Sequence, residues 1–158
     1  MRRLWILSFA LVVLSGIALH ARSATPIRVH SLNSIIITQP QEQKVMREFH
    51  GVKLGLKADA VHAALGKPES ASENREDFKI TDDNSVTVHY DNGAVKAIQI
   101  RFTSAKDVPA WTDVVGKTEI QQNENGSKFA RAMVPAESFW VSMYQNKDGT
   151  TTSITISR

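Results

Sequence analysis

The dipeptide Asn92-Gly93 restricts the possible folds of this chain more than any other feature, because it separates two stretches in which apolar and polar residues alternate. Asn and Gly tolerate the positive φ angles of a two-residue turn, and Asn-Gly between alternating stretches is the strongest short-range signal for a β-hairpin. We therefore expect antiparallel strands at residues 85–90 and 94–102. A side-chain period of two separates their residues into two faces. One face receives Val86, Val88, Tyr90, Ile98, Ile100 and Phe102, and the other receives Thr87, His89, Gln99 and Arg101.

A short helix precedes this hairpin at residues 58–65. Val61, Ala64 and Leu65 have the i, i+3, i+4 spacing of one buried helical face. Gly66 follows as a residue able to take a left-handed conformation, and Pro68 cannot continue the helix, so the helix end is well specified. The start is weaker, because Lys57 stands where a capping Ser or Thr is expected.

The second half of the chain loosely repeats the first. A helical pattern recurs at residues 111–117, and strand patterns at 128–134, 138–144 and 151–157 mirror those at 77–80, 85–90 and 94–102. Neither half can bury both its helix and its sheet face alone. The predicted fold class is therefore α+β. Two α-β-β-β repeats, at about 51–104 and 105–158, form one antiparallel sheet with the helices packed on one face.

The first 23 residues have the order of a secretory signal peptide: two arginines, an apolar run at residues 4–19, and small residues before a cleavage point after Ser23. As a helix the run reaches roughly 24 Å, short of the ~30 Å hydrocarbon core. Cleavage is favoured, and the alternative is an uncleaved anchor. Residues 24–50 are read as a linker or irregular segment, either a strand followed by a short helix or a tether between membrane and domain.

Charge and cysteine content restrict the partners and the chemistry. Three of the 19 basic residues and none of the 16 acidic ones lie in the leader, so the remaining chain is balanced in charge. Such a chain lacks the basic excess that nucleic-acid binding requires. It contains no cysteine, which excludes disulfides, thiolate metal sites and lipid attachment through cysteine. The domain must be stabilised by packing alone.

A family resemblance follows from four segments taken together: residues 51–55 (Gly-Val-Lys-Leu-Gly), Val61, residues 65–68 (Leu-Gly-Lys-Pro) and residues 90–98. They resemble the small-protein-A (SmpA/OmlA) domain of the outer-membrane assembly lipoprotein BamE and, when doubled, the β-lactamase-inhibitor-protein-like (BLIP-like) fold. The resemblance covers about fifty residues well. It implies that residues 51–158 form a BamE/BLIP-like domain, and that the protein is a non-enzymatic binder of the cell envelope.

The candidate binding residues come from strand 138–144. Alternation there separates Phe139, Val141 and Met143 from the more amphipathic Trp140, Ser142 and Tyr144. If the purely apolar set faces the helices, the open sheet face carries residues of the types enriched at interface hot spots. The predicted partner-binding residues are Trp140, Tyr144, Arg101, Gln99 and His89. The alternative is the opposite register with Trp140 in the core, because a shift of one residue inverts the face.

No catalytic, cofactor-binding or metal-binding residues are predicted, since no nucleophile and base, phosphate-binding loop or His pair at ligand spacing is visible. His62 and His89 are read as ordinary polar-face residues. The functional hypothesis is a non-enzymatic, periplasmic or secreted protein-binding module, including an enzyme inhibitor, whose partner is another envelope or secreted protein. The alternatives are a membrane-anchored structural subunit of an envelope complex and an uncharacterised hydrolase; membrane contact requires an uncleaved leader.

Overall fold

The computed structural model describes residues 44–158, so the expected leader at 1–23 and residues 24–43 of the expected linker lie outside the described part. This part consists mostly of antiparallel β-sheet with few helices, which places it loosely in the α+β class. The elements are β1 (Glu48–Phe49), β2 (Val52–Lys53), α1 (Ala58–Leu65), β3 (Ser70–Ser72), β4 (Arg75–Lys79), β5 (Asn84–Asp91), β6 (Ala94–Phe102), α2 (Trp111–Val115), β7 (Gln121–Gln122), β8 (Lys128–Val134), the 3-10 helix η1 (Pro135–Glu137), β9 (Phe139–Gln145) and β10 (Thr152–Ser157).

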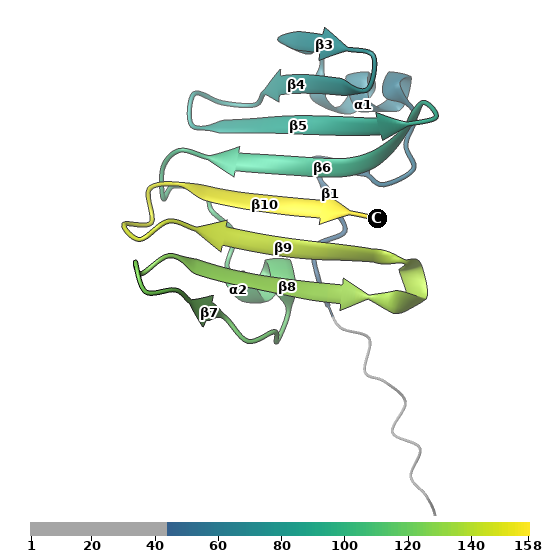
Figure 1. The fold of residues 1–158 in the computed structure, drawn as a ribbon. Coiled ribbons are helices and arrows are strands. Elements are labelled where there is room, and N and C mark those ends of the chain that lie inside the picture. The colour runs from purple at the N-terminus through teal and green to yellow at the C-terminus, as the bar shows by residue number, and fades with distance from the viewer. Residues whose placement is uncertain (1–43) are drawn as a thin grey trace, which may run out of the picture. The chain divides into compact units, whose positions relative to one another are not determined.

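Eight strands form the main sheet, in the order β3-β4-β5-β6-β10-β9-β8-β7 (Figure 1). Every pair in the sheet is antiparallel. The C-terminal strand β10 lies between β6 and β9, so it joins the strands of the first half to those of the second. Three strands were expected in each half, but the structure adds a short fourth strand at each edge, β3 and β7. Both are short and polar, and they lack the apolar alternation from which a strand can be predicted.

The hairpin around Asn92-Gly93 has the expected turn. Asn92 and Gly93 have φ angles of 51° and 69°, and the flanking Asp91 and Ala94 are paired across the two strands. Both positive angles fit the type I′ turn that Asn-Gly favours. The strands are paired so that Val86 lies opposite Ile100 and Thr87 opposite Gln99.

Helix α1 ends as expected but with a different backbone geometry. Lys57 makes no side-chain capping hydrogen bond, and Gly66 has φ 85° and ψ −153°. This combination is not the left-handed helical conformation that the sequence led us to expect. It belongs to an extended, positive-φ region that is essentially restricted to glycine, so Gly66 is required by backbone geometry more strictly than an ordinary C′ residue.

A single hydrophobic core lies on one face of the sheet. Val61 of α1, Val114 and Val115 of α2, and Val52 of β2 are all fully buried in the same cluster as the sheet residues. In Figure 1 both helices and β1 lie behind the sheet. Val45 is also buried in this core, and the Met46 backbone N–H donates to the Val114 carbonyl. The folded unit therefore reaches back at least to Val45, before the expected start at Gly51.

Candidate functional site

The face of the sheet turned away from the core is the candidate site, which we call the open face. In Figure 1 it is the side toward the viewer, where no described helix lies. Strand pairing arranges its side chains in three rows that cross the sheet. The first row is Ser72, Arg75, His89, Ala97, Ser157, Trp140 and Met133. The second row is Ser70, Asp77, Thr87, Gln99, Thr155, Ser142 and Arg131. The third row is Lys79, Ser85, Arg101, Ser153, Tyr144, Phe129 and Gln121.

The register of β9 decides where Trp140 lies. Phe139, Val141 and Met143 are buried in the core, whereas Trp140 is half-buried and Tyr144 is 41% exposed on the opposite side. The structure therefore selects the first of the two registers that the alternation left open. All five predicted binding residues lie on the open face, because Arg101, Gln99 and His89 are also directed away from the core.

The five predicted residues do not form one compact cluster. Trp140 and Tyr144 lie on β9, while Arg101 and Gln99 lie on β6 and His89 on β5. Strand β10 separates the two groups, and it presents only the small side chains of Ser153, Thr155 and Ser157 on this face. The open face thus has three regions. The aromatic half lies on β8 and β9, a strip of hydroxyl groups lies on β10, and the polar half lies on β4, β5 and β6.

The aromatic half contains three residues of β8 that the sequence analysis missed: Phe129, Arg131 and Met133. The guanidinium carbon of Arg131 lies 4.4 Å from the centre of the Trp140 ring and 5.7 Å from that of Phe129, within the range of a cation–π interaction. Met133 pairs with Trp140 across the strands and is 57% exposed. Ala130 and Ala132, the intervening residues of β8, are small enough to be buried beneath α2. The alternation of these two alanines with Phe129, Arg131 and Met133 could have revealed the cluster from the sequence.

The polar half contains a shallow hollow of about 540 Å³, lined on the open face by residues of β4, β5, β6 and β10. Asp77 lies at its rim, and both of its carboxylate oxygens are occupied. Oδ1 accepts hydrogen bonds from Thr87 Oγ1 at 2.6 Å and from the Arg75 guanidinium at 2.9 Å, and Oδ2 accepts one from Ser70 Oγ at 2.8 Å. The Thr87 hydrogen bond, supported by Arg75 and Ser70 and opposed by partial burial, lowers the pKa of Asp77.

The Asp77 carboxylate should make the free energy of unfolding depend on pH. A lowered pKa in the folded state means that the stabilisation is complete above the unfolded-state pKa of about 3.9 and is lost as pH falls through the folded value. We expect Asp77→Asn to lower the free energy of unfolding by about 1 kcal/mol at pH 7, because Asp77 is partly exposed, and by less at pH 3. Urea unfolding at both pH values measures this difference. Asp83→Asn is the control, because Asp83 is exposed and its carboxylate has no ion-pair partner within residues 44–158; an equal loss at both pH values for Asp77→Asn would contradict the assignment.

A second polar group lies on the helix-covered side, where α1 meets the sheet. Glu76 of β4 is buried, with Oε1 at 2.8 Å from His62 Nε2 and Oε2 accepting a 2.5 Å hydrogen bond from the Tyr90 hydroxyl. Burial and then the Glu76 carboxylate raise the pKa of Tyr90. His62, expected to be an ordinary polar-face residue, is partly exposed and also contacts this carboxylate. Its partner lies fourteen residues away and is reached only through the fold.

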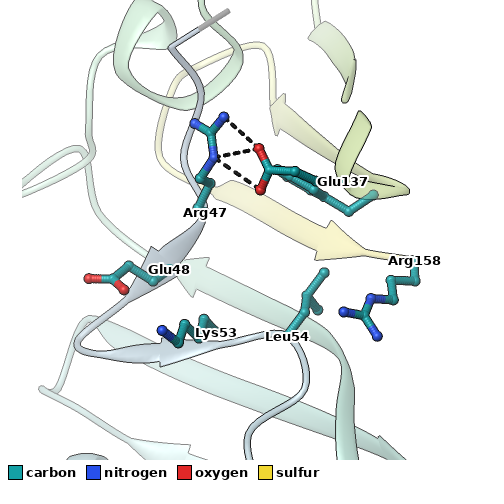
Figure 2. Close-up of a pocket in the computed structure, with 7 residues that line it drawn as sticks. Arg47, Glu48, Lys53, Leu54, Glu137 and Arg158 are labelled. Carbon is teal, nitrogen blue, oxygen red and sulfur yellow. Dashed lines mark hydrogen bonds and ion pairs between the residues drawn. The ribbon is translucent and has the colours of Figure 1, made fainter. Parts of the chain in front are cut away.

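A pocket of about 390 Å³ lies beside the β1–β2 hairpin (Figure 2). Its main feature is an ion pair in which the Arg47 guanidinium donates to both carboxylate oxygens of Glu137, at 2.8 and 3.0 Å to Oε1 and 3.3 Å to Oε2. Arg47 also lies over the Phe139 ring at 6.0 Å. These contacts tie the segment before β1 to η1 and the start of β9, so we interpret this pocket as a structural junction.

None of the helices within residues 44–158 is long and apolar enough to cross a membrane. In the same range no three His, Cys, Asp or Glu side chains are grouped as possible metal ligands. Comparison with known proteins gave no match to a protein-family model, a curated protein or a solved structure.

Proposed function

We propose that this chain is an exported, non-enzymatic protein of the cell envelope whose open face binds another envelope or secreted protein. The observation that carries the proposal is the grouping of Trp140, Arg131, Phe129, Tyr144 and Met133 on an uncovered face of the described sheet. Trp, Tyr and Arg are the residues most enriched at interface hot spots, and interface cores are also enriched in Phe and Met. An inhibitor of a hydrolase would bind through the same kind of surface.

The small residues of the neighbouring strands support a flat contact. Ser153 and Thr155 of β10 lie in the middle of the open face and are partly exposed, whereas the neighbouring Ser142 and Ser157 are buried. A partner segment can therefore exchange hydrogen bonds with the hydroxyl groups of Ser153 and Thr155, while the aromatic half supplies the apolar contact. Such a division into an apolar anchor and a polar surround is typical of specific protein interfaces.

We also propose that the two halves of the domain are structural repeats, at about 51–104 and 105–158, as in a doubled BamE-like, BLIP-like domain. Val61 and Val114 are each the fourth residue of their helix, and each is fully buried. Gly66 and Gly116 follow the two helices with similar geometry, at φ 85°, ψ −153° and φ 63°, ψ −137°. A long antiparallel sheet with two helices on one face is the arrangement that this resemblance implies.

The export part of the proposal depends on the leader at residues 1–23, followed by cleavage after Ser23. It places the protein in the periplasm or outside the cell. An uncleaved leader would favour the alternative of a membrane-anchored subunit of an envelope complex. A tag at the C-terminus of the full chain makes the intact mass of the recovered protein a direct measure of cleavage.

Trp140→Ala tests the face. We expect the C-terminally tagged full chain to capture a partner from envelope extracts, and the Trp140→Ala variant to lose at least 2 kcal/mol of binding free energy, or roughly 30-fold in affinity, as hot-spot residues do. Ile120→Ala is the control, because Ile120 is an exposed apolar residue outside the strands. Unchanged partner recovery by a folded Trp140→Ala protein would remove this face from the proposal.

A further inference from the structure

We infer that the partner presents an acidic segment to the open face, with its carboxylates bound by Arg131 and Arg101. This inference rests on the proposed function and specifies the chemistry of the partner. It comes from two arginines of the open face, Arg131 and Arg101, that have no ion-pair partner among the described residues.

The paired charges of the open face are confined to one side of the sheet. Arg75 is bonded to Asp77, and Lys79 is bonded to Asp82 at 2.8 Å. Asp77 is the only carboxylate in the three rows, and its oxygens are occupied by Thr87, Ser70 and Arg75. For Arg131 and Arg101, by contrast, the described residues provide no carboxylate within ion-pair distance.

Arg131 is held by aromatic rings before any partner arrives. Its guanidinium carbon lies 4.4 Å from the centre of the Trp140 ring and 5.7 Å from that of the Phe129 ring, and these contacts limit the freedom of the side chain. A guanidinium presents its N–H groups as a planar fork that matches a carboxylate in a bidentate arrangement. Because the side chain is exposed, a partner can reach these N–H groups.

Arg101 has a different setting, in the hollow on the polar half. The hollow is also lined by Ser85, Gln99, Ser153 and Thr155, which can donate hydrogen bonds to a carboxylate beside the guanidinium. Glu69 lies at the same rim, where its charge acts on Lys79. The hollow thus combines the Arg101 guanidinium with several neutral donors, and its two carboxylates are those of Asp77 and Glu69.

The spacing of the two arginines indicates how the acidic residues must be arranged. Arg101 on β6 and Arg131 on β8 are separated by β10 and β9 and by one row along the strands. At about 4.8 Å between strands and 3.4 Å per residue, their backbones are roughly 15 Å apart, which an extended peptide spans in about five residues. The path between them crosses two small residues, the partly exposed Thr155 and the buried Ser142.

An acidic protein segment fits this pattern better than a nucleic acid or another polyanion. Polyanion binding requires several phosphates to be neutralised along a basic stripe. Among the described residues, the three rows of the open face hold only two Lys or Arg side chains without an ion-pair partner. These two arginines lie far apart, and one of them is held by aromatic rings. Two separated carboxylates with an apolar side chain near Trp140 match these groups one to one.

A displayed library of random twelve-residue peptides, selected on the full chain expressed with its leader, tests the inference. We expect the enriched peptides to carry two acidic residues about five positions apart. Their binding should fall at least tenfold with Arg131→Gln or with Arg101→Gln, and should weaken in 0.5 M salt. Lys53→Gln is the control, because Lys53 is an exposed cation of the β1–β2 hairpin and should leave binding unchanged.

The other outcomes separate this inference from the proposed function. Enriched peptides without acidic bias, lost by Trp140→Ala but kept by both arginine variants, would overturn the acidic partner and retain the binding face. Peptides unaffected by Trp140→Ala, or no enrichment, would overturn both. Arginine-dependent binding of a DNA oligonucleotide at physiological salt would overturn the acidic protein segment in favour of a phosphate polyanion.

Discussion

Met143→Ala is expected to lower the free energy of unfolding by 2–5 kcal/mol, whereas Tyr144→Ala, one residue further along β9, should change it by less than about 1 kcal/mol. Met143 is fully buried among the apolar residues beneath the helices, and Tyr144 is 41% exposed on the open face. Truncating Met143 removes buried methylene groups and the sulfur and leaves a cavity that the packed core cannot fill completely. Truncating Tyr144 loses surface contacts and a 3.3 Å hydrogen bond to Ser127.

Urea unfolding of the two variants and the wild type, followed by circular dichroism, gives both values. The pair is informative because neighbouring residues of a strand are directed to opposite faces, so one experiment tests the register of β9. If Tyr144→Ala were the more destabilising change, Trp140 would face the core as well. The open face would then lose its aromatic half.

Glu76→Ala is expected to produce the second large effect, a loss of about 2–4 kcal/mol in the free energy of unfolding. The carboxylate joins three elements, because it contacts His62 of α1 and accepts the hydrogen bond of Tyr90 of β5. Its removal leaves the Tyr90 hydroxyl, in a residue only 9% exposed, without its partner. An unsatisfied buried polar group costs more free energy than a hydrogen bond contributes on average.

Glu76→Gln is the matched variant, since an amide can still accept from Tyr90 and donate to a neutral His62. We expect it to lose less stability than Glu76→Ala. Glu48→Ala supplies a control for an exposed glutamate, with an expected change within about 0.5 kcal/mol. Equal stabilities of Glu76→Ala and wild type in thermal or urea unfolding would show that this network contributes nothing.

The Glu76 network also separates stability from binding. It lies on the helix-covered side of the sheet, and the residues proposed to contact a partner lie on the other side. At temperatures and urea concentrations below its unfolding midpoint, Glu76→Gln should therefore bind the selected acidic peptides as the wild type does, whereas Arg131→Gln should not. This contrast distinguishes a damaged fold from a damaged binding surface.

Much of the secondary structure could be predicted because its signals are local. Alternation and the Asn92-Gly93 turn indicated β5 and β6, and the i, i+3, i+4 spacing before Gly66 indicated α1. Strand β8 was also predicted with its observed bounds, residues 128–134. In each case the apolar period of the segment matches the geometry that it adopts.

Other elements have no local signal. Strands β3 and β7 are polar and form by pairing with β4 and β8 at the sheet edges. The pairing of His62 with Glu76 depends on α1 packing against β4. The cation–π contact of Arg131 with Trp140 depends on the register between β8 and β9. These contacts join residues that are distant in sequence, so no single segment predicts them.

By itself, then, the sequence determined where strands turn, where α1 stops and which residues alternate, because these properties depend on backbone preferences and on the period of apolar side chains. It did not decide which face of β9 is buried, since both registers satisfy the same alternation. Only the tertiary structure decided this, because the helices and the β1–β2 hairpin pack on one face of the sheet and bury Phe139, Val141 and Met143 there. That packing leaves Trp140 beside Arg131 on the other face, where a partner can reach them.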